Sequence, residues 1–345
     1  MRILFDLVHP ADALFFHHSI KKLATAGHEV HIASRQKDVL LPLLDGLHLP
    51  HQSLSNAGAG LAGLAVELAV RDARLFCFAR HVRPDIMVGF GGVAIAHIGK
   101  LLGIPSIGFY DTEHAGLQLA LTLPFISEWH VPVSWQGREA KGRTYRFQGS
   151  KQMAYLHPQY FKPDNAIARL AGLDEDRDNF LVRIVAWQAN HDSGRSGISD
   201  AQLDRLVAHL GSKGKVHISA EGALPAHLEA LRFRGDAVAF HHLLAHCQLY
   251  CGESITVASE AVMLGVPALL QIDKEYCYIT EQENAGLIRR FDDAANVVAA
   301  IDGLLAEDPA KFRERAYDFA LGLPDLNHYI VNTILRAGNR KPANP

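Results

Sequence analysis

The most informative stretch of this chain is Gly-Glu-Ser-Ile-Thr-Val-Ala-Ser-Glu-Ala-Val-Met-Leu-Gly-Val-Pro, residues 252–267. The apolar run Leu249–Cys251 before it is typical of a buried strand, and Gly252 allows a turn because it has no Cβ. A helix that starts near Ser254 points its first N–H groups and the positive end of its dipole at the space beyond the strand. A phosphate group bound there would be stabilised. Glu260, two turns on, suits ribose hydroxyls. Most strand–turn–helix units bind nothing, so nucleotide binding stays a hypothesis from this stretch alone.

The composition is that of a soluble globular protein. At 345 residues the chain is longer than a usual single domain, which predicts two domains, each with its own core. Hydrophobic residues make up 48%, charged residues 21%, and the net charge is −3. This balance excludes binding to nucleic acid or to an acidic membrane through bulk charge.

No targeting or membrane-spanning segment is expected. The chain starts with the strand-like run Arg2–Asp6, without the basic and then apolar pattern of a signal peptide. The longest weakly polar run, Ala57–Val70, contains Glu67 and is shorter than the roughly 20 residues that span a bilayer. We therefore predict a cytoplasmic protein in which this run is a buried helix. A peripheral contact with the inner face of the membrane is the alternative.

Cysteines and histidines predict neither disulfides nor a metal site. Four cysteines are too few for a disulfide scaffold in a chain of this size, which fits a reducing compartment. Three histidines, at 241, 242 and 246, precede Cys247 and Cys251, but the second ligand pair that zinc sites show at loop distance is missing. Both cysteines are therefore expected to be small buried hydrophobes.

Strand-like and helix-like segments alternate along the chain, which predicts parallel sheets with crossover helices. In the first half the predicted strands are Ile3–Val8, Glu29–Ala33, Asp85–Gly89 and Ser106–Tyr110, and the predicted helices are Ala13–Ala26, Lys37–Leu44, Leu61–His81 and Val93–Leu102. In the second half the predicted strands are Phe180–Ala186, Val216–Ser219, Val238–Phe240, Leu249–Cys251 and Ala268–Ile272.

The alternation stops between Gln148 and Asp178, where prolines and a charged run interrupt the pattern. We place a domain boundary there, which gives an N-terminal domain of residues 1–156 and a C-terminal domain of residues 157–324. An amphipathic helix over residues 325–338 is expected to pack back on the first domain.

Ligands of open parallel sheets bind beyond the carboxyl ends of the strands, so polar residues in those loops are the candidate site residues. His9 and Asp12 follow the first strand, and either could act as a general base. The alternative for His9 is a cap on the next helix. The other loops contribute Gly91, Gly92, Asp111, Glu113, His114, Ser193–Gly197 and Ser254–Glu260.

The loop at residues 111–114 offers carboxylates beside an imidazole, an arrangement that orients a histidine or raises its pKa. Its alternative is structural, with Asp111 or Thr112 as a helix N-cap and Glu113 in a capping box. The Gly/Ser-rich loop Ser193–Gly197 is either a ligand loop or a plain mobile loop.

Two motifs are absent from the sequence, and their absence disfavours two enzyme classes. Gly91 and Gly92 follow a predicted strand but are not part of a G-x-G-x-x-G, so they give no sign of a Rossmann dehydrogenase. The chain has no G-x-x-x-x-G-K-[ST] of a P-loop NTPase and no G-x-S-x-G of a nucleophile-elbow hydrolase.

Three segments carry a resemblance to a known superfamily: Pro-Asp-Ile-Met-Val-Gly-Phe-Gly-Gly at 84–92, Leu-Leu-Gly-Ile-Pro-Ser at 101–106, and Ser-Glu-Ala-Val-Met-Leu-Gly-Val-Pro-Ala at 259–268. With them the chain resembles the GT-B superfamily over about residues 1 to 325. Within it the chain most resembles domain-of-unknown-function family 354, which is similar to the peptidoglycan GlcNAc transferase and the UDP-GlcNAc 2-epimerases.

This resemblance implies an α/β protein of the GT-B class, with two Rossmann-like domains facing each other across a cleft. The C-terminal domain would bind a nucleotide-diphosphate sugar as co-substrate, and the N-terminal domain would hold the acceptor. No cofactor or metal is implied, because helix dipoles and amides stabilise the departing diphosphate. The nucleotide-sugar-binding residues predicted on this basis are Ser193, Gly194, Arg195, Gly252, Ser254, Thr256, Glu260, Gly91 and Gly92.

Three functions remain open. The first is an inverting glycosyltransferase that uses a nucleotide-sugar donor, UDP-linked by preference, and a glycan, lipid-linked or small-molecule acceptor, with His9 or Asp12 as base. The second is a nucleotide-sugar 2-epimerase that uses Asp111, Glu113 and His114. The third is a non-catalytic GT-B protein, because Ser254-Ile255 stands where related sequences usually have two glycines. Nothing in the pattern predicts an oligomer.

Overall fold

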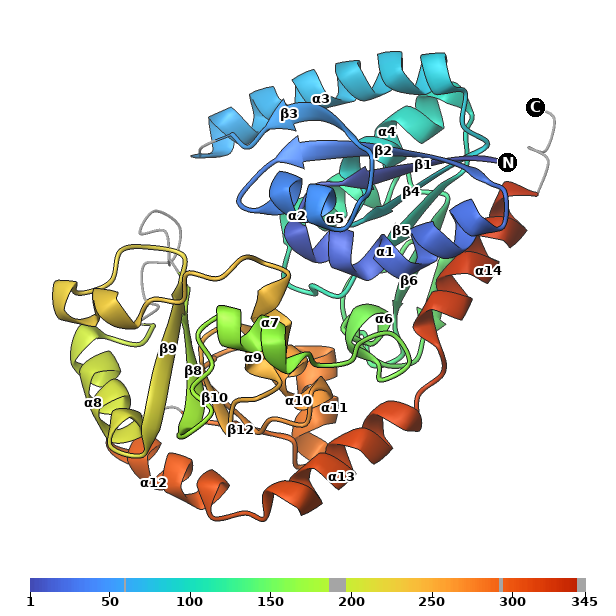
Figure 1. The fold of residues 1–345 in the computed structure, drawn as a ribbon. Coiled ribbons are helices and arrows are strands. Elements are labelled where there is room, and N and C mark those ends of the chain that lie inside the picture. Colours follow the sequence, from blue (N-terminus) through green and yellow to red (C-terminus); the bar gives the residue numbers. More distant parts are fainter. Residues whose placement is uncertain (59, 186–196, 292–293, 340–345) are drawn as a thin grey trace. The chain divides into compact units, whose positions relative to one another are not determined.

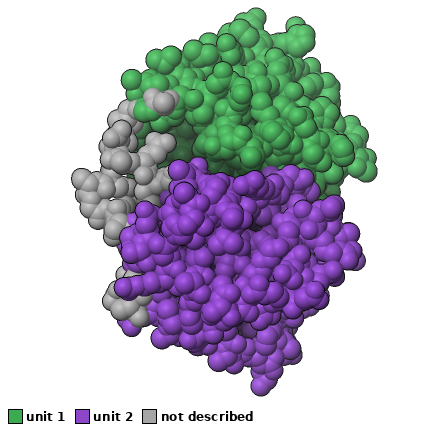
Figure 2. All heavy atoms as spheres, turned by 60° about the vertical axis from the view of Figure 1, so that its left-hand side comes forward, with its two compact units in different colours: residues 1–155, 324–345 green, residues 156–323 purple. Residues whose placement is uncertain are grey.

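The structure is a computed structural model that describes residues 1–58, 60–185, 197–291 and 294–339. The chain divides into two compact units, coloured separately in Figure 2. Unit 1 comprises Met1–Tyr155 and Pro324–Pro345, and unit 2 comprises Leu156–Leu323. The predicted ligand residues Ser193, Gly194 and Arg195 lie outside the described residues.

Unit 1 is built on a seven-stranded parallel sheet of order β3-β2-β1-β4-β5-β6-β7 (Figure 1). The predicted parallel sheet is confirmed, and three short, partly polar strands were not predicted. The strands are β1 Arg2–Leu7, β2 Glu29–Gln36, β3 Gln52–Asn56, β4 Ile86–Phe90, β5 Ser106–Phe109, β6 Glu128–Pro132 and β7 Thr144–Phe147. The helices are α1 Pro10–Thr25, α2 Leu40–Gly46, α3 Gly60–Val82, α4 Val93–Leu102, α5 Gly116–Thr122, α6 Met153–Leu156 and α14 Leu326–Gly338.

The core of unit 1 forms where α1 lies on the middle strands. Phe15 and Phe16 are fully buried, and their rings lie 5.5 Å from Phe109 and 5.3 Å from Phe5 respectively, between centroids. Burial of one such side chain contributes about 1.5–3 kcal/mol. This packing fixes the start of α1, and with it the polar loop that follows β1.

The C-terminal helix α14 is held on unit 1 by buried polar contacts. Asn327 is fully buried, accepts a hydrogen bond from Ser19 Oγ at 2.7 Å and donates one to the Ala154 carbonyl at 2.7 Å. Tyr329 Oη lies 2.7 Å from His130 Nδ1. Since a buried amide costs free energy unless it is paired, these partners fix the position of α14.

The first half of α3 is exposed, so the prediction of a buried helix over Ala57–Val70 was wrong. Leu64, Val66 and Val70 are 44%, 65% and 40% exposed. The physical reason is that this part of the helix turns a charged side chain inward and apolar ones outward. Glu67 is buried and pairs with Arg35. The described part of the chain has no helix long and apolar enough to cross a membrane.

Unit 2 is built on a five-stranded parallel sheet of order β12-β11-β10-β8-β9, with β10 in its centre. Its strands are β8 Asp178–Ile184, β9 Gly214–Ala220, β10 Leu249–Gly252, β11 Ala268–Leu270 and β12 Ile288–Arg290. Its helices are α7 Asn165–Leu170, α8 Asp200–Gly211, the 3-10 helix η1 Ala226–Leu231, α9 Ala239–Leu244, α10 Ile255–Met263, α11 Cys277–Asn284, α12 Ala294–Leu305 and α13 Pro309–Leu321.

One predicted strand of unit 2 is a helix. The run Val238–Phe240 was expected to be a strand, but α9 starts at Ala239. The carboxylate of Asp236 accepts a hydrogen bond from the Ala239 N–H at 2.7 Å, which satisfies an N–H group at the helix start. Three apolar residues were too short a run for periodicity to distinguish the two structures.

Candidate functional site

The turn between β10 and α10 has the strand–turn–helix geometry that the sequence predicted. Ser254 is the N-cap of α10, and its Oγ accepts a hydrogen bond from the Val257 N–H at 3.3 Å. The hydroxyl of Tyr250 accepts from the Ser254 N–H at 3.2 Å and donates to the Ser254 carbonyl at 3.0 Å. The positive end of α10, which includes Thr256, therefore lies at the carboxyl end of the central strand.

The close approach of β8 and β10 requires a glycine at residue 252. It pairs in register with Arg183 of β8, and a Cβ at residue 252 would lie 2.9 Å from the Arg183 nitrogen and 3.0 Å from the Tyr250 hydroxyl. A side chain there would push β8 and β10 apart. Gly252 thus brings Arg183 beside the start of α10.

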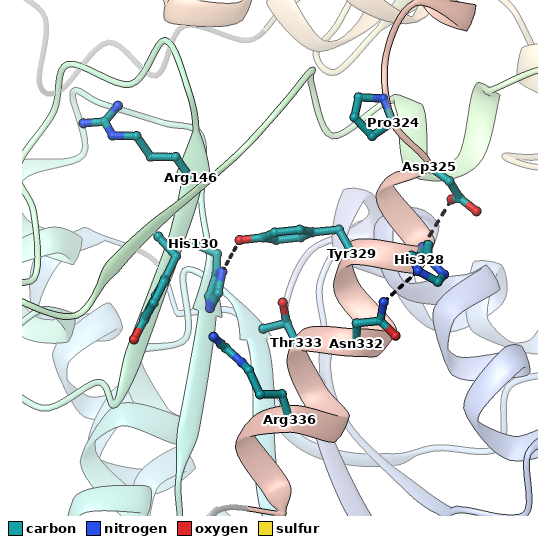
Figure 3. A pocket seen from close by; sticks show the side chains of 10 residues that line it. His130, Arg146, Pro324, Asp325, His328, Tyr329, Asn332, Thr333 and Arg336 are labelled. Carbon is teal, nitrogen blue, oxygen red and sulfur yellow. Dashed lines mark hydrogen bonds between the residues drawn. The ribbon is translucent and has the colours of Figure 1, made fainter.

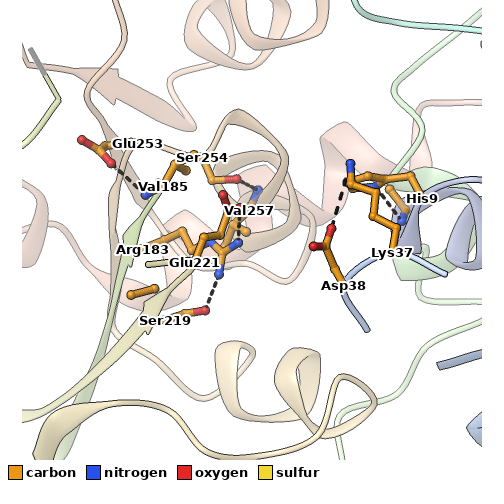
Figure 4. A network of polar contacts seen from close by, with 12 residues as sticks. His9, Lys37, Asp38, Arg183, Val185, Ser219, Glu221, Glu253, Ser254 and Val257 are labelled. Atoms are coloured by element: carbon orange, nitrogen blue, oxygen red, sulfur yellow. Dashed lines mark hydrogen bonds and ion pairs between the residues drawn. The ribbon is translucent and has the colours of Figure 1, made fainter. Parts of the chain in front are cut away.

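Arg183 is a cation at this edge that the sequence analysis missed. Its Nη1 donates to Ser219 Oγ at 2.7 Å and its Nη2 to the Glu221 carboxylate at 2.6 Å, as Figure 4 shows. Its Nε is buried and has no hydrogen-bond partner within the described residues. A charged residue inside an otherwise apolar strand was the signal that could have indicated it.

Glu260 lies in the second turn of α10 and is 4% exposed. Its Oε1 is 3.3 Å from Nε2 of His241, which is also buried and belongs to α9. The ribose-binding role of Glu260 stays a prediction. The structure adds a partner, His241, that the sequence analysis considered only as a metal ligand.

The carboxylate of Glu253 has a backbone role. It accepts hydrogen bonds from the N–H groups of Val185, at 2.8 Å, and Ile198. Glu253 is 5% exposed, so its charge is satisfied within the protein. Val185 and Ile198, which lie 68 and 55 residues before Glu253, are thereby tied to the turn that leads into α10.

His9 and Asp12 form a reciprocal cap at the start of α1. Nδ1 of His9 accepts a hydrogen bond from the Ala11 N–H at 3.2 Å. Oδ2 of Asp12 accepts from the N–H groups of Val8 and His9, each at 2.9 Å. The alternative that His9 caps the next helix is therefore confirmed, and both side chains are fixed in place.

Burial gives these two side chains different proton chemistry. Burial raises the pKa of Asp12 to about 7, against the opposing effects of two N–H donors and Lys151. Burial, followed by the charges of Lys37, Lys151 and Arg35, lowers the pKa of His9 to about 3. Asp12 thus exchanges a proton near neutral pH, whereas His9 stays neutral.

The hydrogen bond at Nδ1 also fixes which ring nitrogen of His9 carries the hydrogen. Since Nδ1 accepts from Ala11, a neutral His9 carries its hydrogen on Nε2 and donates from there. If Nδ1 also took a proton, it could no longer accept the hydrogen bond from the Ala11 N–H that caps α1. Of the two predicted bases, Asp12 is therefore the better proton acceptor and His9 the better hydrogen-bond donor.

Asp111 forms a buried ion pair with Lys151. The two side chains lie 3.1 Å apart, between Oδ2 and Nζ, and the residues are 1% and 7% exposed. The ammonium also lies 5.4 Å from the centroid of the Phe90 ring. The alternative that Asp111 or Thr112 is a helix N-cap was wrong, because α5 is capped at Ala115. No motif marked Lys151 in the sequence.

The other predicted residues of unit 1 have local contacts. Glu113 accepts a hydrogen bond from the Gln136 N–H at 2.8 Å, and His114 is exposed. Gly91 and Gly92 have φ of 75° and 53°, values that favour glycine, and the Gly91 N–H donates to the Phe109 carbonyl at 2.7 Å. Both glycines are explained by the turn, and their predicted nucleotide contacts stay a prediction.

A surface cavity of about 780 Å³ lies in unit 1 at the β6–β7 edge of the sheet (Figure 3). His130 and Tyr329 meet in it, and Arg336 of α14 forms an ion pair with Glu128 beside it. None of the residues predicted for the site lines this cavity. Its lining residues are His130, Tyr145, Arg146, Pro324, Asp325, His328, Tyr329, Asn332, Thr333 and Arg336.

The comparison with protein families confirms the resemblance. Residues 1–302 match the family described as protein of unknown function DUF354. The chain belongs to this family. No match was found among curated proteins.

Solved structures with the same fold include epimerases and a transferase. UDP-GlcNAc 2-epimerase from Methanocaldococcus jannaschii matches with a TM-score of 0.72 and 15% identity, over 97% of this chain and 100% of that chain. The Neisseria meningitidis enzyme bound to UDP-GlcNAc matches with 0.73 and 14%, over 97% and 100%. Spinosyn rhamnosyltransferase SpnG complexed with thymidine diphosphate matches with 0.64 and 15%, over 96% and 100%. The chain therefore has the GT-B fold, as predicted.

Proposed function

We propose that this protein is a metal-independent, inverting glycosyltransferase. It transfers a sugar from a nucleotide-diphosphate donor, a UDP-sugar by preference, to a hydroxyl group of a glycan, lipid-linked or small-molecule acceptor. The observation that carries the proposal is the grouping of Arg183, the start of α10 and Glu260 at the carboxyl edge of the unit 2 sheet.

These three features match the parts of a nucleotide diphosphate. The dipole and N–H groups at the start of α10 favour an anion, and the guanidinium of Arg183, which is paired with Glu221, is the cation nearby that would contact it. Two structures with this fold hold UDP-GlcNAc and thymidine diphosphate, which supports a nucleotide diphosphate as ligand here.

Unit 1 supplies the proton acceptor. The carboxylate of Asp12 takes the proton of the acceptor hydroxyl while that oxygen bonds to the anomeric carbon. The bond between this carbon and the diphosphate breaks, and the configuration inverts because attack and departure are on opposite faces. The Nε2–H of His9 is suited to hold an oxygen of the substrate. Arg183 and the start of α10 stabilise the charge on the diphosphate.

A scan of nucleotides by thermal unfolding tests the proposal. We expect at least one of UDP, GDP, CMP, TDP and ADP, at millimolar concentration, to raise the melting temperature. The shift should vanish in Glu260→Ala and persist in Glu314→Ala, which removes an exposed glutamate of α13. If no nucleotide stabilises the wild-type protein, the proposal fails and the non-catalytic alternative replaces it.

A nucleotide-sugar 2-epimerase is the second candidate. It is favoured by a second buried carboxylate, Asp111 with Lys151, at the same sheet edge as Asp12, because epimerisation needs acid and base groups on both faces of the sugar. Incubation with UDP-GlcNAc in deuterated water distinguishes the two reactions. Deuterium at C2 indicates epimerisation, and its absence removes this candidate.

A further inference from the structure

We propose that His241 positions the carboxylate of Glu260, so that the nucleotide site selects ribonucleotides over 2′-deoxyribonucleotides. The inference rests on the proposed function, in which Glu260 is the ribose anchor. It adds a specificity residue and the class of donor that the site accepts.

The carboxylate and the imidazole meet between two neighbouring helices. His241 Nε2 of α9 lies 3.3 Å from Glu260 Oε1 of α10, and the two side chains are 8% and 6% exposed. Ring contacts fix the imidazole further, since Phe161 and Phe240 lie 6.2 and 5.6 Å from it, between centroids, both nearly perpendicular to it. The position of Nε2 relative to α10 is therefore set by packing.

The next residue serves a different purpose. Nδ1 of His242 accepts a hydrogen bond from the Asp164 N–H at 2.9 Å, and its ring packs on Phe161 at 4.8 Å between centroids. His242 is thus occupied at the start of α7. His241 contacts Glu260, so its neighbour His242 serves as the matched control.

A carboxylate buried in this way has one favoured orientation. Burial of a charge is costly unless it is hydrogen bonded, so the N–H of His241 stabilises one rotation of the Glu260 carboxylate. A carboxylate held in place accepts from a ribose hydroxyl without reorganising. A deoxyribose leaves that acceptor without its partner, and a site built to bond a substrate hydroxyl rejects analogues that lack it.

A purely structural role predicts a different outcome. If the pair only ties α9 to α10, removing the imidazole weakens the binding of all nucleotides by the same factor. If it orients Glu260, removal lowers the preference for the 2′-hydroxyl itself. The ratio of two affinities therefore separates the two roles.

Isothermal titration of the full chain with UDP and with 2′-deoxy-UDP tests the proposal. We expect the wild-type protein to bind UDP about ten-fold or more tightly than the deoxy form, the scale of one hydrogen bond to a charged group. His241→Phe should reduce this ratio to near one. His241→Gln, which keeps an N–H donor, should retain most of it, and His242→Phe should leave it unchanged.

The outcomes distinguish failure of this inference from failure of the proposed function. If the wild-type protein binds UDP and 2′-deoxy-UDP equally, the inference is wrong while the nucleotide site stands, and this comparison needs no variant. An unchanged ratio in a folded His241→Phe also overturns it. If TDP, which lacks the 2′-hydroxyl, is the one nucleotide of the scan that binds, the inference is wrong while the proposed function stands. If no nucleotide in the scan binds at all, the proposed function fails and the inference fails with it.

Discussion

The carboxyl edges of the two sheets share one architecture and differ in chemistry. The edge of unit 1 holds a buried acid with a pKa of about 7, Asp12, and a buried ion pair, Asp111 with Lys151. The edge of unit 2 holds the start of a helix, Arg183 beside it, and a buried histidine–glutamate pair. In the proposed function this difference assigns proton transfer to unit 1 and binding of the nucleotide diphosphate to unit 2.

Replacement of Asp12 should have the largest effect. We expect Asp12→Asn to lower the rate of nucleotide release from the donor sugar by about 10²–10⁴-fold, because a positioned general base contributes on that scale. Nucleotide affinity, measured by titration, should not change, since the base belongs to unit 1. A variant that turns over normally would show that unit 1 does not take the proton through Asp12.

Loss of Lys151 should destabilise unit 1 strongly. Lys151→Met leaves the Asp111 carboxylate buried without its partner, which is expected to cost about 3–5 kcal/mol of unfolding free energy. The double variant Lys151→Met with Asp111→Asn should recover much of that loss. Urea unfolding measures both. Equal stability of the single and double variants would mean that the two side chains are not coupled.

The stability of the wild-type protein should depend on pH through Asp12. Its pKa rises from 3.8 to about 7 on folding, so the stabilisation it gives is full below pH 3.8 and is lost as the pH rises through 7. Relative to Asp12→Asn, the wild-type protein should lose up to about 4 kcal/mol between pH 4 and pH 8. Unfolding curves of both proteins across this range test it, and a constant difference would refute the raised pKa.

Glu253 should act on structure and not on turnover. Glu253→Ala leaves the N–H groups of Val185 and Ile198 without their acceptor, at about 1–3 kcal/mol each if they stay buried. Glu253→Gln keeps one acceptor oxygen and should lose about half as much, as measured by urea unfolding. If the alanine variant is as stable as the wild-type protein, the carboxylate does not hold these two segments.

The exposed face of α3 should contribute least. Leu64→Ser with Val66→Ser is expected to change the unfolding free energy by less than about 0.5 kcal/mol per site, because both side chains face solvent. Leu75→Ser on the buried face of the same helix is the control and should be strongly destabilising. A large loss in the double variant would mean that this face is covered in solution. Vesicle flotation of the same proteins tests the alternative, a peripheral contact with the membrane.

The fold was predictable because the alternation of strand-like and helix-like segments extends along most of the chain. Alternating strands and helices gave both parallel sheets, and the stretch from Gly252 to Pro267 gave the turn into α10. The prediction failed for short elements such as Val238–Phe240, because three apolar residues fit a strand or a helix equally. The inward face of α3 could not be predicted for another reason. Glu67 points inward to Arg35, against the usual preference of charged residues for solvent.

The site was only partly predictable. Loop position identified His9, Asp12 and Asp111, because the carboxyl ends of parallel strands gather at one edge. Partners could not be deduced, because they come from distant parts of the sequence: Lys151 lies 40 residues from Asp111. His241 and Glu260 are likewise brought together only by the packing of α9 and α10.

Hydrogen–deuterium exchange of the full chain with a saturating nucleotide diphosphate tests most directly whether unit 2 holds the anion. The peptides that cover Tyr250–Met263 and Arg183 should be protected by the nucleotide, whereas those that cover the β6–β7 edge of unit 1 should not change. Protection confined to unit 1, or no protection at a concentration that saturates binding, would contradict the assignment of the nucleotide to the start of α10.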